Sequence, residues 1–327
     1  MNWQSKSVLV TGAGGFIGSH LAEALVRAGA KTRAMVHYNS LGRRGWLDQS
    51  DLKDDLEVIA GDIREVDSVR TALKGVDTVF HLAALIAIPY SYVSPSSYVS
   101  TNIAGTLNIL QESLRLGVSR VVHTSSSEVY GTAKQIPISE NHPLQGQSPY
   151  SATKIGADKL AEAFHRSFGL PISIVRPFNT YGPRQSTRAI IPTIIMQALA
   201  GEPIRIGNVA PTRDFNYISD TVRGFLLNAA SKEVVGRVIN LGTGKEISIG
   251  DLAKAICSLA GRECRIVQED ERVRPSRSEV ERLCAANSLA DELTGWRPEV
   301  SLNDGLRKTL EWMRSNLDHY QPEIYAL

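Results

Sequence analysis

The sequence predicts an α/β protein with a doubly wound parallel sheet and a smaller mixed α/β lobe. Two observations support this prediction. Short β-rich runs alternate with helix-like stretches from residue 7 to about residue 177, and turn-forming prolines and glycines become dense after that point. Strict alternation is typical of βα units whose helices cover both faces of a sheet. Its loss after residue 177 indicates a second unit.

Six runs of β-branched and apolar residues are expected to form the parallel strands, and stretches with helical patterns lie between them. The runs are residues 7–11, 32–36, 56–60, 78–82, 120–124 and 172–176. Further along, residues 214–241 have a strand, helix, strand pattern. We therefore expect one domain of residues 1–177, to which 214–241 return. Residues 178–213 and 242–327 are expected to form the smaller lobe.

Composition narrows the possible functions. The 327 residues suffice for a large core, and 36 Lys and Arg against 34 Asp and Glu give a formal charge of +2. With nearly equal numbers of positive and negative side chains, the sequence predicts no extended positive surface that would bind nucleic acid or an anionic membrane. The three cysteines, Cys257, Cys264 and Cys284, lack the spacing of metal sites or disulfide frameworks, so we expect reduced thiols and no metal.

The N-terminus bears on location. Met1 leads almost directly into the first predicted strand, which leaves no room for a signal peptide, and no apolar run reaches the roughly 20 residues of a membrane span. The sequence therefore predicts a cytoplasmic protein.

A glycine-rich segment, Thr-Gly-Ala-Gly-Gly-Phe-Ile-Gly at residues 11–18, joins the first strand to an amphipathic helix. Gly12 suits a tight turn, Gly15 allows the backbone to approach a pyrophosphate, and Gly18 permits close helix packing. The helix N-terminus offers free N–H groups to the anion. A purely structural turn is the alternative, but this position after the first strand favours dinucleotide binding in a Rossmann-type domain.

Two further positions concern the dinucleotide. Asp62 follows the third strand, where its carboxylate can accept from the amine of adenine or cap a helix. Residues 35–39 lack the acid that binds the ribose hydroxyls of NAD. Arg43 and Arg44 follow, and they either pair with the 2′-phosphate of NADP or are solvated loop charges. The choice between NAD and NADP stays open.

Tyr150 and Lys154 are four residues apart at the start of a helix-like stretch, so their side chains share one face. A free tyrosine has a pKa of about 10, and an ammonium within roughly 4–6 Å favours the phenolate. This spacing predicts a proton-abstracting tyrosine, and Lys154 can also hold the nicotinamide ribose. The alternative is that Tyr150 and Lys154 are an exposed, non-catalytic pair on a helix surface. The dinucleotide-binding turn earlier in the chain argues against this alternative.

In these motifs the chain resembles the extended short-chain dehydrogenase/reductase superfamily, in the branch that modifies nucleotide sugars. The resemblance is carried by residues 11–18, 61–63, 81–84, 101–102, 125–131, 150–154, 176–183 and 213–215. It implies that the dinucleotide is bound by Gly12, Gly15, Phe16, Ile17, Gly18, Asp62, Ile63, Leu82, Ala83, Ala84, Asn102, Tyr150 and Lys154. It also implies that Ser126 assists Tyr150 at a sugar hydroxyl. The substrate diphosphate would contact Asn179, and the nucleotide half would contact Arg213 with Arg274 or Arg282.

Within this branch, residues 126–128 (Ser-Ser-Glu) distinguish the reaction classes, because simple epimerases need no carboxylate there. In 4,6-dehydratases an acidic pair commonly follows the catalytic Ser or Thr. Its first member protonates the leaving C6 hydroxyl, and its glutamate removes the C5 proton. Here Glu128 occupies the second position but Ser127 replaces the first acid, as GDP-mannose 4,6-dehydratases also show. The identity of the acid stays open, with a water held by Ser127 as one candidate. A surface carboxylate is the alternative role for Glu128.

Residues 85–92, 142–150, 211–217, 274–275 and 279–283 resemble the bacterial N-acetylglucosamine-nucleotide 4,6-dehydratases, including the GDP-linked enzyme of legionaminic acid synthesis, a cell-surface sugar pathway. This resemblance implies a nucleotide-diphosphate sugar substrate and oxidation at C4 by hydride transfer to NAD(P)+. Water is then lost across C5 and C6, and the hydride returns to C6. The cofactor would stay tightly bound and be recycled.

Three alternatives remain. UDP-glucuronate decarboxylases share Ser-Glu-Val-Tyr-Gly at residues 127–131, although Tyr-Ser-Ala-Thr-Lys at 150–154 argues against them. A C4 epimerase is the next alternative. A non-catalytic NAD(P)-sensing protein would not need Ser126, Glu128, Tyr150 and Lys154 together. The nucleotide base and the 2-acetamido group stay open.

Apolar residues in the helices around 95–116 and 150–169 exceed what one sheet face needs. They predict a homodimer joined by a four-helix bundle, as in the relatives that the resemblance implies.

Overall fold

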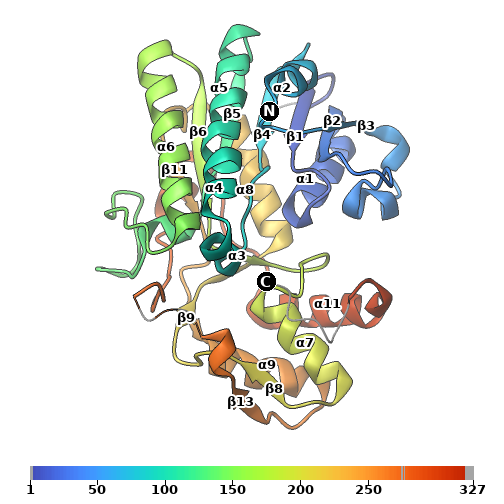
Figure 1. Cartoon of the computed structure of the whole chain (residues 1–327), viewed down its shortest axis with the longest axis vertical. Coiled ribbons are helices and arrows are strands. Elements are labelled where there is room, and N and C mark those ends of the chain that lie inside the picture. The colour runs from blue at the N-terminus through green and yellow to red at the C-terminus, as the bar shows by residue number, and fades with distance from the viewer. Residues whose placement is uncertain (1–2, 274, 276, 321–327) are drawn as a thin grey trace.

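The main unit of the computed structural model, which describes residues 3–273, 275 and 277–320, is a parallel sheet of seven strands (Figure 1). The strand order is β11-β6-β5-β4-β1-β2-β3, and every neighbouring pair is parallel. The order reverses between β1 and β4, as in doubly wound nucleotide-binding sheets. The strands are β1 Ser7–Thr11, β2 Lys31–His37, β3 Glu57–Gly61, β4 Thr78–His81, β5 Arg120–Thr124, β6 Ile172–Pro177 and β11 Val238–Leu241. The predicted fold class is confirmed.

The central strand β1 has an apolar middle because helices cover both faces of the sheet. Val8, Leu9 and Val10 of β1 are all fully buried. Residues on both sides of such a strand avoid water, which explains the unbroken apolar run in the sequence. The edge strand β3 is less buried and less uniformly apolar.

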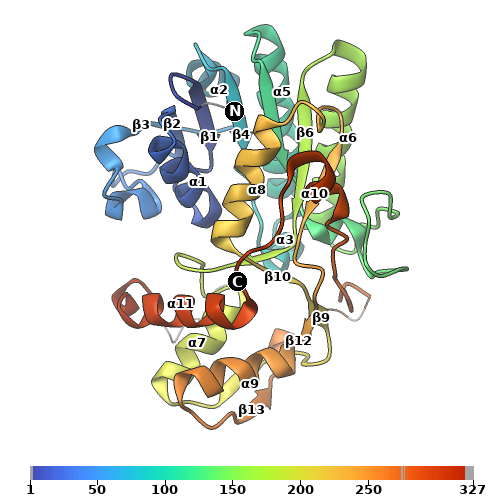
Figure 2. The ribbon, with the colours of Figure 1, turned by 180° about the vertical axis from the view of Figure 1, so that it is seen from behind.

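Three helices cover each face of the sheet (Figures 1 and 2). One face carries α2 Val66–Leu73, α5 Gly105–Arg115 and α6 Pro149–Phe168. The other carries α1 Phe16–Arg27, α8 Ile218–Ala230 and α10 Ser288–Thr294. Between β4 and α5 the chain forms α3 Ile88–Val93, α4 Pro95–Tyr98 and a π-helical segment, Val99–Ala104.

Helix α10 lies against α8 and β11, whereas the sequence analysis assigned all of residues 242–327 to the smaller lobe. The cause is Trp296, which follows α10 and is fully buried. Its indole Nε1 donates to the carbonyl of Asp220 at the start of α8, at 2.8 Å. The buried Trp296 side chain therefore holds α10, a segment late in the sequence, against the main sheet.

The smaller lobe lies at the carboxyl ends of the sheet strands (Figure 1). It contains α7 Ile190–Ala200, α9 Ile249–Ala260, α11 Leu302–Arg314 and short strand pairs. The pairs are β8 Ile204–Ile206 with β13 Ile266–Gln268, β9 Thr212–Arg213 with β12 Ile247–Ser248, and β7 Asn179–Tyr181 with β10 Phe215–Tyr217. One apolar core runs through both units. Ligands of doubly wound sheets bind at this edge.

The short 3₁₀ helices are Gly45–Gln49, Lys53–Asp55, Ser127–Tyr130, Asp270–Arg272 and Leu317–His319. Among the described residues, no helix combines the length and the apolar character needed to cross a lipid bilayer.

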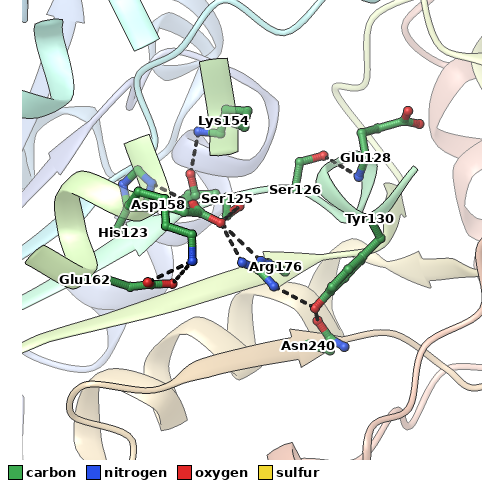
Figure 3. A network of polar contacts seen from close by, with 12 residues as sticks. His123, Ser125, Ser126, Glu128, Tyr130, Lys154, Asp158, Glu162, Arg176 and Asn240 are labelled. Atoms are coloured by element: carbon green, nitrogen blue, oxygen red, sulfur yellow. Dashed lines mark hydrogen bonds and ion pairs between the residues drawn. The ribbon is translucent and has the colours of Figure 1, made fainter. Parts of the chain in front are cut away.

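A buried ion pair joins helix α6 to the sheet (Figure 3). The Asp158 carboxylate accepts from Nη2 of Arg176 at 2.9 Å and from the Ser125 hydroxyl at 2.8 Å, and His123 Nε2 lies 3.3 Å away. Burial by itself would raise the pKa of Asp158. The neighbouring His123 ring, the charge of Arg176 and the Ser125 hydroxyl together hold that pKa below its ordinary value. The carboxylate is therefore charged at neutral pH.

The same network reaches the edge strand β11. Nη1 of Arg176 donates to the Tyr130 hydroxyl at 2.9 Å, and this hydroxyl donates to Oδ1 of Asn240 at 2.7 Å. Helix α6, strands β5, β6 and β11 and the turn after β5 are thus connected through buried polar groups.

Asp158→Ala tests this network. The change leaves Arg176 buried without its carboxylate, so we expect the free energy of unfolding to fall by about 3–5 kcal/mol in urea titrations. The matched control is Asp67→Ala, because Asp67 pairs with Arg70 at 2.6 Å on the surface. The control should lose less than about 1 kcal/mol. Equal losses in the two variants would contradict a dominant role for the buried pair.

Candidate active site

The glycine-rich turn between β1 and α1 is shaped for a pyrophosphate. Gly12 has a φ of +70°, and a Cβ there would lie 2.9 Å from the amide nitrogen of Ala83. A Cβ on Gly18 would lie 2.2 Å from the carbonyl oxygen of Gly12. Helix α1 begins at Phe16, followed by Ile17, and no side chain caps its first amides in the described chain. These N–H groups remain for an anion, so the residues present fit a dinucleotide.

The loop after β4 packs against this turn through Thr11, a residue to which the sequence analysis gave no separate role. Its Oγ1 accepts from the amides of Leu82 and Ala83 at 3.1 and 3.0 Å. Leu82, Ala83 and Ala84 are therefore brought beside the glycines, and all three are partly buried.

Asn102 lies next to the loop after β4. The sequence analysis predicts it beside the dinucleotide, and its side chain is buried within the π-helical segment. Oδ1 accepts from the Leu85 amide at 2.9 Å, and Nδ2 donates to the Leu85 carbonyl at 3.0 Å and to the Thr153 hydroxyl at 3.1 Å. Asn102 thus holds the loop after β4 against helix α6.

Asp62 and Ile63 lie at the end of β3. The Asp62 carboxylate accepts from Nε of Arg64 at 2.9 Å, and this hydrogen bond lowers the pKa of Asp62. The N-cap of α2 is Glu65, so Asp62 is not the helix cap. The side chain of Ile63 packs in the core against Gly105, where a Cβ would lie 2.6 Å from Ile63 Cδ1. The Ile63 side chain is therefore not exposed to a ligand.

A capping box starts α6 directly before the predicted tyrosine. The Ser148 hydroxyl accepts from the Ser151 amide at 3.1 Å, and the Ser148 amide donates to the Ser151 hydroxyl at 3.0 Å. Tyr150 consequently lies in the first turn of the helix. Its ring is buried and meets the ring of Tyr98 edge-on at 6.3 Å between centroids.

Lys154 lies one turn further on, and its Nζ donates to the Thr124 carbonyl at 2.6 Å. Burial lowers the pKa of Lys154 to about 8, with the charge of Asp158 acting in the opposite direction. Burial raises the pKa of Tyr150 well above its ordinary value, although a hydrogen bond with Ser126 opposes this. The expected phenolate-favouring effect of Lys154 is therefore outweighed, because the hydroxyl is buried and the ammonium is engaged by a carbonyl.

Ser126 connects the tyrosine to the turn that carries Glu128. Strand β5 ends at Thr124, and Ser126 caps the 3₁₀ helix that follows, accepting from the Glu128 amide at 3.2 Å. The charge of Glu128 acts on the Tyr150 hydroxyl and raises its pKa further. Ser127 is buried. In Figure 3 Ser126 lies between Lys154 and Glu128. Ser126, Glu128 and Tyr150 thus form one cluster at the carboxyl end of β5.

The residues expected to hold the substrate lie toward the smaller lobe. Asn179 begins β7, and its Oδ1 is buried with no hydrogen-bond partner among the residues that the structure describes. Arg213 is buried on β9, with Nη2 3.2 Å from Oε1 of Glu279. Arg282 forms a bridge with residue 212, the neighbour of Arg213, and pairs with Glu246. Arg274 lies outside the described residues.

Sequence reasoning missed the groups beneath this cluster. Thr124 receives the Lys154 ammonium, and Asp158 and Arg176 form the buried pair. One signal was present, since Asp158 follows Lys154 by four residues and shares its helix face. A carboxylate on a buried face requires a cationic partner.

Comparison with known proteins places this arrangement in a family. The sequence model of the GDP-mannose 4,6-dehydratase family matches residues 9–309. A UDP-glucose 4-epimerase of Mycolicibacterium smegmatis is 35% identical over 315 residues, covering 94% of this chain and 98% of that protein. DesIV, the dTDP-glucose 4,6-dehydratase of Streptomyces venezuelae with NAD bound, is 32% identical with a TM-score of 0.88, covering 97% of this chain and 99% of that one.

A longer relative also matches. It is a protein of Arabidopsis thaliana and is 33% identical over 325 residues. Its full description is trifunctional UDP-glucose 4,6-dehydratase/UDP-4-keto-6-deoxy-D-glucose 3,5-epimerase/UDP-4-keto-L-rhamnose-reductase. Those residues are 96% of this chain and 48% of that protein, so the chain spans about half the length of this relative. Several structural neighbours contain NAD, and the glycine-rich turn of this chain fits a dinucleotide of that kind. The chain belongs to the GDP-mannose 4,6-dehydratase family, whose members are NAD-dependent nucleotide-sugar dehydratases and epimerases.

Proposed function

We propose that this protein is a nucleotide-sugar 4,6-dehydratase that converts an NDP-hexose, NDP-GlcNAc in particular, to the 4-keto-6-deoxy sugar. The proposal rests on the position of Glu128: its amide donates to the Ser126 hydroxyl at 3.2 Å, and that hydroxyl is hydrogen-bonded to Tyr150. Epimerisation at C4 needs proton transfer at the C4 hydroxyl alone, whereas elimination needs a second base at C5. Glu128 supplies that second base beside the first.

The chemistry follows from these positions. Tyr150, hydrogen-bonded to Ser126, takes the proton of the C4 hydroxyl. NAD(P)+, which the glycine-rich turn and Lys154 would hold, would supply the acceptor for the C4 hydride and its return to C6. The ketone at C4 acidifies the C5 hydrogen, which Glu128 removes as a proton and returns to C5 when C6 is reduced. The C6 hydroxyl then leaves as water, with its proton coming from an acid or water next to Ser127. Net oxidation is zero.

Substrate binding is assigned to Asn179, Arg213 and Arg282. The buried Oδ1 of Asn179 needs a donor, which an ordered water or a hydroxyl of the substrate can supply. Arg213 and Arg282 are held in place by Glu279 and Glu246, which orients two guanidiniums on neighbouring segments for a nucleotide diphosphate. The resemblance of residues 85–92 and 142–150 to GlcNAc-nucleotide dehydratases supports a 2-acetamido sugar.

A C4 epimerase is the second candidate, because a relative with 35% identity is a UDP-glucose 4-epimerase. One experiment separates the candidates. The purified protein is incubated with UDP-GlcNAc, GDP-GlcNAc, dTDP-glucose and UDP-glucuronate, and the product masses are measured. Dehydration removes the mass of water, decarboxylation removes that of carbon dioxide, and epimerisation leaves the mass unchanged. We expect loss of water from a GlcNAc nucleotide.

Tyr150→Phe keeps the ring that packs against Tyr98 but removes the ionisable hydroxyl. We expect normal folding by circular dichroism and retained nucleotide-sugar binding by calorimetry. Turnover should fall roughly 10²–10⁴-fold, the usual contribution of a positioned acid or base. Near-parental turnover would assign the base to another residue.

Glu128→Gln preserves the shape of the side chain but removes the proposed base at C5. The variant should still oxidise C4, so reduced nicotinamide absorbance should accumulate and persist after mixing with substrate. Dehydrated product and exchange of the C5 hydrogen with deuterated water should both nearly vanish, because both need the same proton removed. Glu162→Gln on the surface of α6, where Glu162 pairs with Lys159, is the control and should behave like the parent. Parental C5 exchange in Glu128→Gln would remove the main support for dehydration.

We also propose a homodimer through α5 and α6. Apolar side chains that a partner copy would cover are exposed on the π-helical segment before α5 and at the C-terminal ends of α5 and α6. They are Val99, Leu114, Leu116 and Phe168, exposed by 49%, 37%, 40% and 58%. Sedimentation of the parent should give a dimer, and the double variant L114E/F168E should shift it to a monomer. A fully active monomer at micromolar concentration would exclude this assembly.

A further inference from the structure

A pocket of about 200 Å³ lies at the carboxyl ends of β2 and β3, and its lining includes Val36, His37, Asn39, Arg43 and Arg44. This volume is below the roughly 300–1,000 Å³ of whole-ligand sites, so the pocket suits one part of a larger ligand. In a doubly wound sheet the end of the second strand is where the adenosine ribose binds.

The loop that carries the two arginines is fixed to the glycine-rich turn. A Cβ on Gly14 would lie 2.6 Å from the carbonyl oxygen of Arg44. The amide of Trp46 donates to the Gly14 carbonyl at 3.0 Å. The arginines therefore stand at a set distance from the pyrophosphate-binding amides, and the pocket belongs to the same dinucleotide.

The groups lining the pocket do not suit a ribose with free hydroxyls. Among the described residues no carboxylate lines it, and the acceptor oxygen of Asn39 is already used. This Oδ1 accepts from the amides of Leu41 and Arg43 at 3.2 and 3.0 Å, and Nδ2 donates to the Arg43 carbonyl at 2.6 Å. The Asn39 side chain therefore shapes the loop and offers no acceptor to a ribose hydroxyl.

The cations, in contrast, lack counter-ions. Within residues 3–273, 275 and 277–320, neither Arg43 nor Arg44 has its guanidinium in an ion pair. The nearby Asp48 carboxylate accepts from the main-chain amide of Arg44, at 3.0 Å. Asp62 is held by Arg64, with His37 Nε2 at 3.5 Å. Two of the residues that line this pocket are therefore arginines with no paired acid in the described part of the chain.

We propose that the pocket selects NADP(H) over NAD(H), and that Arg43 and Arg44 bind the 2′-phosphate of the adenosine ribose. A phosphate dianion offers the oxygens that two guanidiniums need, through short charge-assisted hydrogen bonds. A ribose without this phosphate would leave the charges of Arg43 and Arg44 unneutralised. Its hydroxyls would also find no carboxylate to accept their hydrogen bonds. The inference rests on use of a nicotinamide dinucleotide and applies equally to a dehydratase and to an epimerase.

Direct binding to cofactor-free protein tests the proposal without an activity assay. Calorimetric titrations compare NADP+ with NAD+, and 2′,5′-ADP with 5′-ADP, which isolates the contribution of the 2′-phosphate. We expect the phosphorylated member of each pair to bind about tenfold tighter or more, and its advantage to shrink as salt increases. Equal affinities within either pair would overturn the proposal.

The double variant R43Q/R44Q assigns the effect to these residues. It should lose about tenfold or more in affinity for NADP+ while its affinity for NAD+ stays within about twofold. Arg115→Gln on α5 is the matched control, because Arg115 is an exposed arginine on a helix remote from β2. NADP+ binding that survives the double variant would overturn the role of the two arginines. The dehydratase proposal is tested separately, by the product masses with the four nucleotide sugars. A failed cofactor proposal would show in the binding titrations, and a failed dehydratase proposal would show in the product masses.

Discussion

The buried pair of Asp158 and Arg176 is the constraint on which the active site depends. It joins α6 to β6, and the Ser125 hydroxyl adds β5 to the same carboxylate. Tyr150 and Lys154 lie on α6, while Ser126 and Glu128 follow β5. The relative position of the two groups proposed to transfer protons is therefore held by one buried charged contact, where a lost partner cannot be replaced by water.

That interior also determines the protonation chemistry. Burial lowers the pKa of Lys154 to about 8 and raises the pKa of Tyr150, so both shifts favour the neutral form. Asp158 is the nearby anion that keeps some preference for the Lys154 ammonium. The proposed role of Tyr150 as a base therefore requires a positive charge and the Ser126 hydrogen bond to oppose the effect of burial. The buried network around Asp158 therefore affects the charges of the site and also holds its residues in position.

The smaller lobe braces the cofactor site as well as the substrate site. Trp46, directly after the arginine-bearing loop, meets Trp312 of α11 edge-on at 5.6 Å between centroids, and it lies 6.4 Å from the ring of Tyr320. Aromatic contacts of this kind add packing energy beyond area burial. A loop anchored by the glycine-rich turn on one side and by α11 on the other can hold Arg43 and Arg44 in place, although both are exposed.

Sequence alone determined the strands, the glycine-rich turn and the helical pairing of Tyr150 with Lys154, because each depends on neighbours a few residues apart. An apolar run in a doubly covered sheet, a glycine at a crowded turn and an i, i+4 pair are local patterns. Only the tertiary structure decided that Asn102 clamps a loop, that α10 returns to the sheet and that burial raises the pKa of Tyr150. These outcomes depend on contacts across long separations, such as the 72 residues between Thr11 and Ala83, and on burial by distant segments, which no local pattern encodes.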